Sequence, residues 1–262
     1  WAESSAVIFA NSVIGASSNR EGAPSSLASA LTGRTPYYGY HIEENRRPSA
    51  EVSLESDLKT ELDFSLFGYV LGERVSGVPF IHGRVMKPSL GEIKLFGAAA
   101  AASGDLALFH WENVTPESRK YKVHKKGLEH VSIGEGDLKD ALDRLSTGGE
   151  PDAICLGCPH LGLSELCEVA SILKGRRLNR RLLCFTSRTV YREALRRGFV
   201  KSIERAGGKV IRDTCMVVSP LKEAGIDGME TNSCKAAYYA PSLNGVSVSL
   251  SDMRRSLKEA SN

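Results

Sequence analysis

Long hydrophobic runs and an excess of charge of one sign are both missing from this sequence. Its apolar stretches are interrupted by Gly and Ser, well before the ~18 residues that a membrane-spanning helix needs. The 34 basic and 31 acidic residues leave a net charge of +3. That balance does not indicate nucleic-acid binding, and the basic stretch 176–181 is most simply a solvated turn. We therefore expect neither a membrane nor a nucleic acid among the partners.

Cysteine is too scarce for a disulfide scaffold, and no targeting signal is apparent. Six cysteines are spread over 262 residues, mostly in apolar runs, which is typical of a reducing compartment. The chain begins with Trp1 instead of an initiator Met, and residues 2–14 have the pattern of a helix, not of a signal sequence. We expect a cytoplasmic protein whose sequence here is the C-terminal portion of a longer, N-terminally truncated chain.

Nucleotide-binding and hydrolase signatures are missing as well. The sequence has no Gly-x-x-x-x-Gly-Lys loop, and no Gly-x-Gly-x-x-Gly turn at the end of a predicted strand. Ser187 and the six histidines are too scattered to indicate a Ser-His-Asp triad. The function has to be sought in other residues.

What the sequence does contain is an alternation of strands and helices, clearest in its second half. Such alternation predicts a parallel sheet covered by helices on both faces. We predict an α/β protein with a mixed α/β region over residues 1–120 and a parallel, doubly wound domain over 121–262. The predicted strands are 37–42, 78–81, 106–110, 130–133, 153–156, 182–185 and 210–212, and the predicted helices are 2–14, 24–33, 59–71, 90–102, 137–145, 163–173 and 189–206.

Two cysteines directly follow predicted strands. Cys158 stands in Gly157-Cys158-Pro159-His160 and Cys215 in Asp213-Thr214-Cys215. Ligands of open α/β sheets bind beyond the carboxyl ends of the strands, where two thiolates could share an iron–sulfur cluster or a zinc ion. Two buried thiols are the alternative, because free Cys is often buried and no pair of Cys-x-x-Cys motifs is present. Three other cysteines fall in predicted strands or on a helix face and are assigned to the core: Cys155, Cys167 and Cys184.

A loop near the start of the chain could bind an anion. Residues 15–24 are rich in turn formers and precede a predicted helix that begins at Pro24, whose N-terminus would present free N–H groups. Arg20 would add a planar, permanently charged group. A surface loop explains the same residues, and His41 and Arg46 could likewise face either a cleft or solvent.

Several motifs together resemble the aconitase X family, along the whole chain and in the right order. The resemblance implies an aconitase-like iron–sulfur dehydratase built from a large catalytic chain and a small swivelling-domain subunit or fused domain. This chain resembles the large part. The motifs are Ala2-Glu3-Ser4-Ser5-Ala6-Val7, Asn11-Ser12, Asn19-Arg20-Glu21-Gly22, Leu31-Thr32-Gly33-Arg34-Thr35-Pro36, Glu44-Asn45-Arg46, Gly157-Cys158-Pro159-His160, Asp213-Thr214-Cys215 and Thr231-Asn232-Ser233.

The resemblance also implies a set of site residues. Three cysteines would hold a cluster, expected to be [4Fe–4S]; Cys158 and Cys215 occupy two of the positions, and the third is expected upstream of Trp1. An open iron would help the substrate hydroxyl leave. The base is expected to be a serine of the small subunit, and His160 could hydrogen-bond the cluster or the leaving hydroxyl. The residues expected to bind a small anionic substrate are Asn19, Arg20, Glu21, His41, Asn45, Arg46 and Lys235.

The family divides by substrate. One branch dehydrates (R)-5-phosphomevalonate to trans-anhydromevalonate 5-phosphate for isoprenoid synthesis in archaea, and another dehydrates cis-3-hydroxy-L-proline. The stretch Asn19–Pro24 resembles the first branch. Ser17-Ser18 stand where the family pattern has Arg-Thr, and Cys234 and Tyr238 depart from it beside Lys235. The second branch and a non-catalytic, partner-binding remnant therefore stay open as alternatives.

Overall fold

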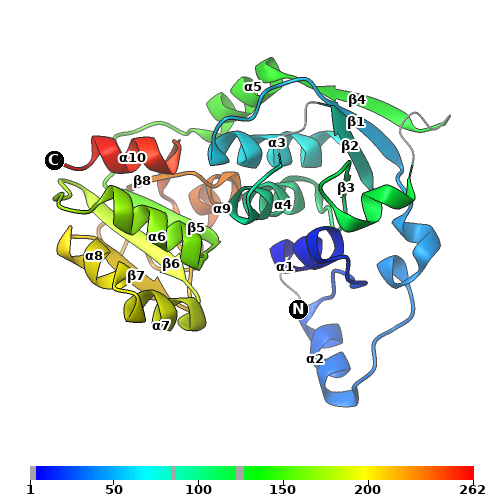
Figure 1. The fold of residues 1–262 in the computed structure, drawn as a ribbon, viewed down its shortest axis with the longest axis horizontal. Helices are drawn as coiled ribbons and strands as arrows, with labels where there is room; N and C mark the ends of the chain where they lie inside the picture. Colours follow the sequence, from blue (N-terminus) through cyan, green and yellow to red (C-terminus); the bar gives the residue numbers. More distant parts are fainter. Residues whose placement is uncertain (1–3, 84–86, 122–126) are drawn as a thin grey trace. The chain divides into compact units, whose positions relative to one another are not determined.

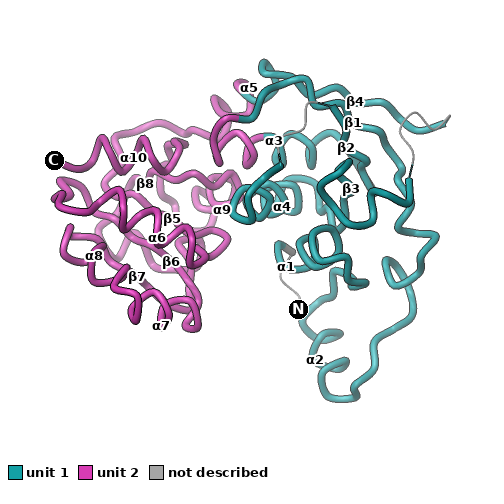
Figure 2. The backbone as a smooth tube through the Cα atoms, in the orientation of Figure 1, with its two compact units in different colours: residues 1–58, 67–138 teal, residues 59–66, 139–262 magenta. Residues whose placement is uncertain are grey.

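The computed structural model describes residues 4–83, 87–121 and 127–262. The chain forms two compact units: residues 1–58 with 67–138 (unit 1), and residues 59–66 with 139–262 (unit 2) (Figure 1, Figure 2). Each unit contains its own parallel sheet. No helix in the described ranges is long and apolar enough to cross a membrane.

Unit 1 is built on a four-stranded parallel sheet of order β3-β2-β1-β4. The strands are β1 (Ala50–Leu54), β2 (Pro79–Gly83), β3 (His110–Trp111) and β4 (Glu129–Ile133). The helices are α1 (Ser4–Phe9), which continues as a π-helix over Ala10–Ile14, α2 (Ala23–Thr32), α3 (Glu61–Arg74) and α4 (Leu90–Gly104). Short 3₁₀ helices cover Gly39–His41, Glu43–Arg46 and Pro116–Lys120.

Small residues let α3 and α4 approach closely. A Cβ at Gly68 would collide with the backbone of Phe96, and one at Gly72 would lie 2.6 Å from the carbonyl oxygen of Ala100. Glycine avoids both collisions because it has no side chain. The Phe96 ring then packs against Phe67 and Trp111, at centroid distances of 5.1 Å to each. These aromatic rings are fully buried and form the centre of the unit 1 core.

Unit 2 is built on a five-stranded parallel sheet of order β7-β6-β5-β8-β9. Its strands are β5 (Ala153–Leu161), β6 (Arg181–Thr186), β7 (Lys209–Arg212), β8 (Gly228–Thr231) and β9 (Ser247–Leu250). Its helices are α6 (Leu163–Ile172), α7 (Arg188–Arg196), α8 (Phe199–Arg205), α9 (Cys234–Asn244) and α10 (Met253–Glu259), and α5 (Glu135–Leu145) runs from unit 1 into it.

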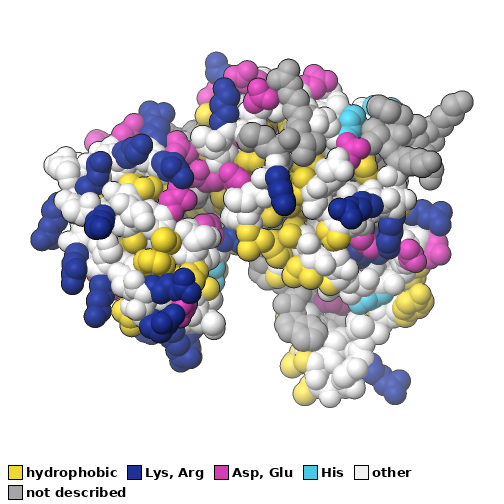
Figure 3. All heavy atoms as spheres, in the orientation of Figure 1, with side chains coloured by type: hydrophobic (Ala, Val, Ile, Leu, Met, Phe, Trp, Pro, Cys, Tyr) yellow, Lys and Arg dark blue, Asp and Glu magenta, His cyan; other side chains and the backbone are white. Residues whose placement is uncertain are grey.

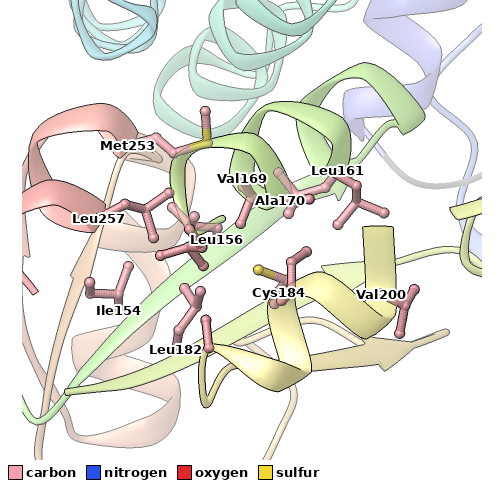
Figure 4. Packing of buried hydrophobic residues seen from close by; sticks show 14 of the residues in the cluster. Ile154, Leu156, Leu161, Val169, Ala170, Leu182, Cys184, Val200, Met253 and Leu257 are labelled. Carbon is pink, nitrogen blue, oxygen red and sulfur yellow. The ribbon is translucent and has the colours of Figure 1, made fainter. Parts of the chain in front are cut away.

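One face of this sheet carries a closely packed apolar core. Ile154 and Leu156 of β5 pack with Leu182 of β6, with Val169 of α6 and with Leu257 of α10 (Figure 4). All are buried, so water is excluded from this face, which is the main source of stability for such a layer.

The structure corrects four predicted elements. Residues 37–42 form no strand, because Gly39 adopts φ 57° within a turn. The predicted strand 106–110 is paired only at His110 and Trp111. The strand predicted at 130–133, placed in the second domain, pairs instead with β1 in unit 1. The predicted helix 189–206 is interrupted at Gly198, whose φ of 84° starts a separate helix.

Candidate functional site

The sheet of unit 2 has a switch point between β5 and β8. From β5 the chain moves through α6 to β6, whereas from β8 it moves through α9 to β9 on the other side. Right-handed crossovers place these two helices on opposite faces, so the loops after β5 and β8 diverge. Ligands of open α/β sheets bind in the crevice that forms at such a point.

Cys158 and Cys215 meet at this end of the sheet. Cys158 lies in the irregular last part of β5, and Cys215 lies in the loop that follows β7. Just before Cys158, Gly157 adopts φ 111°, and a Cβ there would collide with the carbonyl oxygen of Phe185 on β6. The Cys158 thiol donates a hydrogen bond to the Cys215 sulfur. The two sulfurs are therefore neighbours, as the strand ends predict; metal ligation by them stays a prediction.

The two thiols differ in acidity. The hydrogen bond from Cys158 is the largest cause that lowers the pKa of Cys215, to about 5, and the backbone N–H groups of Val218 and Val217 act in the same direction. The pKa of Cys158 is raised, first because it donates to Cys215 and then because it is buried. The pair therefore holds one thiolate at neutral pH.

Neighbouring side chains fix the two cysteine segments to one another. His160 Nε2 donates to the carbonyl oxygen of Thr214 at 2.8 Å, which ties the end of β5 to the loop of Cys215. The hydroxyl of Ser233 donates to the carbonyl oxygen of Cys158, and the same hydroxyl accepts a bond from the Ala236 N–H at the start of α9. The end of β5 and the segments after β7 and β8 are thus joined directly.

Lys235, predicted to bind substrate, lies beside the cysteines. It is half-buried in the first turn of α9, and its positive charge lowers the pKa of both Cys158 and Cys215. A cation beside the two sulfurs would offset the negative charge of thiolate ligands.

The chemistry of this group of residues fits an iron–sulfur cluster or another thiolate-bound metal. Sulfur donors, N–H groups directed at a thiolate and a nearby cation are the features that hold and tune such centres. Among the described residues, no group of three or more His, Cys, Asp or Glu side chains is arranged to hold a metal ion. Cys158 and Cys215 would therefore supply only part of a ligand set.

The other predicted site residues belong to unit 1, and several have internal partners there. Asn19 is 5% exposed. Its Oδ1 accepts from the Tyr40 N–H at 2.6 Å, and its Nδ2 donates to the Tyr38 carbonyl at 2.8 Å. Asn19 therefore fastens the loop 15–22 to the turn around Gly39, where a Cβ would collide with its amide.

Arg46 is the most enclosed of the predicted substrate ligands. Its side chain is 3% exposed and pairs with Glu117 at 2.7 Å. The guanidinium also donates to the carbonyl oxygens of Tyr40 and Ala16, at 3.1 and 3.0 Å. Its donors join three segments of unit 1, so the structure shows a structural use for Arg46, and substrate binding by it stays a prediction.

The remaining predicted residues are more accessible. Arg20 pairs with Asp105 at 2.6 Å, and Glu21 accepts from the Tyr38 hydroxyl at 3.0 Å. Asn45 is exposed and donates to the Gly39 carbonyl at 3.0 Å, and His41 is half-buried on the 3₁₀ helix Gly39–His41. These side chains lie around the loop 15–22 and the turn that follows α2, and substrate binding by them stays a prediction.

Family models match nearly the whole chain in order. The aconitase X first domain matches residues 1–44, the second domain residues 48–143 and the third domain residues 151–262. The chain belongs to the aconitase X family.

Individual relatives agree with the family assignment. The phosphomevalonate dehydratase large subunit of Methanocaldococcus jannaschii is 45% identical over 98% of this chain and 66% of its own length. The cis-3-hydroxy-L-proline dehydratase of Pseudomonas aeruginosa is 36% identical over 94% of this chain and 44% of its own length. The holo-form crystal structure of Thermococcus kodakaraensis aconitase X superimposes with a TM-score of 0.93 and 41% identity, covering 99% of this chain and 67% of that one. This aconitase X chain thus has the α/β fold that its motifs imply, and spans about two thirds of the length of these archaeal relatives.

Sequence reasoning missed some residues of this aconitase X chain that the structure brings to the switch point. Ser233 was identified only as part of a family motif, yet it joins Cys158 to α9. Its position as the N-cap of a helix directly after β8 was the available signal. The backbone N–H groups of Val217 and Val218 carry no sequence signal, because every residue except proline has such a group.

Proposed function

We propose that this chain is the cluster-binding part of a phosphomevalonate dehydratase large subunit, an iron–sulfur hydro-lyase that acts with a small subunit in the cytoplasm. The observation that carries the proposal is the pair of sulfurs, Cys158 and Cys215, joined at the switch point of the unit 2 sheet. All six cysteines are free, which fits a reducing compartment.

The residues have separate roles in this proposal. Cys158 and Cys215 would hold a [4Fe–4S] cluster together with a third cysteine upstream of Trp1. When bound, such a cluster offers an open iron that acts as a Lewis acid on a substrate hydroxyl. Lys235 would balance the charge of the thiolates and attract an anionic substrate. His160 would act as a positioning residue, because its bond to Thr214 holds the Cys215 loop against β5.

Proton removal would come from outside this chain. The large-subunit names of the archaeal relatives support a two-part enzyme with a small subunit, and we assign the base to a serine of that partner. Asn19, Arg20, Glu21, His41, Asn45 and Arg46 would supply the substrate-binding side of the large subunit. Arg20 is the first choice for an anionic group, because its side chain is 34% exposed.

Phosphomevalonate is the substrate that the comparisons favour. Five archaeal phosphomevalonate dehydratase large subunits are 36–45% identical to this chain, and two cis-3-hydroxy-L-proline dehydratases are 35–36% identical. The second activity is the alternative, supported by the Ser17-Ser18 departure from the first branch.

The test is anaerobic iron–sulfide reconstitution of the full-length protein with its small subunit, followed by visible absorbance and by NMR of the dehydration product. We expect a brown protein that dehydrates (R)-5-phosphomevalonate. Cys158→Ser and Cys215→Ser should abolish the absorbance, and the matched control Cys167→Ser, on α6, should keep it. A colourless wild type would contradict the cluster. A coloured enzyme that dehydrates only cis-3-hydroxy-L-proline would establish the alternative.

A further inference from the structure

A group of arginines lies beside the cysteine pair, at the carboxyl ends of β6 and β7. Arg188 and Arg192 stand in the first half of α7, and Arg212 is the last residue of β7. Together with Asp213 they line an open hollow of about 380 Å³, which we call the arginine pocket. Figure 3 shows basic side chains gathered over the part of unit 2 that contains α7.

The arginine pocket carries positive charge that its own residues do not neutralise. Asp213 pairs with Arg188, with 2.8 Å between Oδ2 and Nε. Arg212 stacks on the ring of Tyr191 with its guanidinium carbon 4.7 Å from the ring centroid, which holds it in place through a cation–π contact. In the described part of the chain, Arg192 forms no ion pair. The pocket has three guanidinium groups and one carboxylate, so its net charge is positive and suits a doubly charged anion.

The position of the arginine pocket is suited to a ligand that also reaches the cysteines. Asp213 is separated from Cys215 by one residue of the same loop, so the two Cα atoms are at most ~7 Å apart. Arg188 directly follows the N-cap of α7, where its own N–H donates to Asp213 and the Val190 N–H donates to Ser187, so the anion site rests on the arginine side chains. The carboxyl ends of neighbouring strands thus present the cysteine pair and an anion site side by side.

We infer that the arginine pocket binds the phosphate monoester of the substrate while the substrate hydroxyl faces the cysteine pair. This inference rests on the proposed function. A phosphate monoester carries about −1.5 to −2 charge at neutral pH and offers three acceptor oxygens, which matches two uncompensated arginines. Arginine binds such oxygens through paired N–H donors, and the three oxygens of a phosphate can serve two guanidinium groups at once, whereas a carboxylate has only two oxygens.

The test compares Arg192→Gln with Arg196→Gln in the cluster-loaded full-length protein with its small subunit. Both changes remove one arginine from α7, but Arg196 pairs with Glu193 outside the pocket. Losing a charge-assisted contact should raise the KM for (R)-5-phosphomevalonate about 10- to 100-fold in Arg192→Gln, with little change in kcat. Inorganic phosphate should inhibit the wild type and the control competitively, and should inhibit Arg192→Gln much less. The rate at which non-phosphorylated mevalonate is dehydrated should be equal in the wild type, in Arg192→Gln and in Arg196→Gln.

Separate outcomes decide the pocket and the proposed function. Equal KM values in the two variants would overturn the phosphate site. If the wild type does not dehydrate phosphomevalonate, the proposed function fails, and calorimetry with inorganic phosphate decides the pocket alone. Phosphate binding that is lost only in Arg192→Gln would support the pocket; equal binding in both variants, or no binding to the wild type, would overturn it.

Discussion

At the scale of single residues, the unequal acidity of the two cysteines has a direct chemical consequence. Thiolates, not thiols, react with alkylating reagents, so reactivity follows pKa and exposure. Cys215 is half-buried with a pKa of about 5. Burial raises the pKa of Cys155 and of Cys234 to about 12 and that of Cys184 still further. One cysteine of the metal-free protein should therefore react far faster than these buried ones.

We predict that iodoacetamide labels Cys215 first in the metal-free protein at pH 6.5. Because its pKa is lowered, the labelling rate should stay level above pH 6 and fall as the pH drops through about 5, where the thiolate becomes protonated. Lys235→Met should slow labelling at pH 6, since the lysine charge favours the thiolate. Peptide mass spectrometry after timed quenching measures the rates. Labelling that begins only above pH 8 would contradict a Cys215 thiolate stabilised by the hydrogen bond from Cys158.

Arg46 carries a second prediction at the residue scale. Arg46→Gln would leave Glu117, whose side chain is only 15% exposed, with the exposed Lys120 as its remaining ion-pair partner. Removing one member of a buried, hydrogen-bonded ion pair destabilises a protein by about 3–5 kcal/mol. We expect urea unfolding of the full-length protein to show a decrease in the free energy of unfolding near the lower of these values. The control is Arg47→Gln, one residue away and exposed, which should change stability by less than ~0.5 kcal/mol. Equal effects of the two changes would refute the structural role of Arg46.

At the scale of elements, the short strand β3 depends on a buried histidine. His110 Nε2 donates to the Arg46 carbonyl at 2.7 Å, and its ring contacts that of Tyr121 at a tilt, with centroids 4.6 Å apart. Burial is the largest cause that lowers the pKa of His110 below its ordinary value. The folded protein therefore keeps this imidazole neutral at pH values where the unfolded chain takes up a proton.

This difference predicts a pH dependence of stability. Above pH ~6.5 the histidine is neutral in both states, so its contribution is complete. As the pH falls from there, the unfolded state gains a proton first, and the free energy of unfolding should decrease by up to ~1.4 kcal/mol per pH unit. His110→Gln should flatten that part of the profile between pH 6.5 and 5, measured by urea unfolding. A profile unchanged by the substitution would show that other groups cause it.

The sequence predicts some elements well for an identifiable reason. The strands β5 and β6 begin as apolar runs after polar turns, and the helices that follow them keep a clear apolar stripe, so their patterns agree with their burial. The short strand β7 was found from Val210 and Ile211, which are half-buried. The strands β1, β8 and β9 were missed, because each has only four or five residues and includes polar side chains such as Glu51 and Glu230. Their pairing is set by neighbours far along the chain.

The candidate site was predictable to a similar, limited extent. Cys158 and Cys215 were expected to be neighbours because both follow strands of one parallel sheet. The partners of Arg46 were not predictable, since Glu117 lies 71 positions away. The arginine pocket was not foreseen either: Arg188, Arg192 and Arg212 come from two elements, and only the pairing of β6 with β7 brings them together.

At the scale of the whole molecule, cluster binding should stabilise one unit selectively. A ligand that binds only the folded state protects the segments that must be ordered to hold it. We predict that hydrogen exchange slows on cluster loading in residues 157–160, 214–218 and 232–235, and changes little in the β1–β2 region of unit 1. The comparison is between the reconstituted full-length protein and the same protein after chelator treatment, followed by mass spectrometry. Uniform slowing across both units would contradict a selective effect of the ligands Cys158 and Cys215 on unit 2.

The sheet order of unit 2 also has a consequence for how the protein is made. Along the chain, Cys158 leaves the ribosome two strand–helix repeats before Cys215. In the sheet, β6 lies between β5 and β7, so the two cysteines cannot meet until β7 has docked on β6. Cofactor insertion would therefore be a late event in biogenesis, possible only after this unit has folded. A nascent chain stalled before β7 would lack Cys215 and therefore part of the proposed ligand set, which would disfavour cluster binding by unfinished copies.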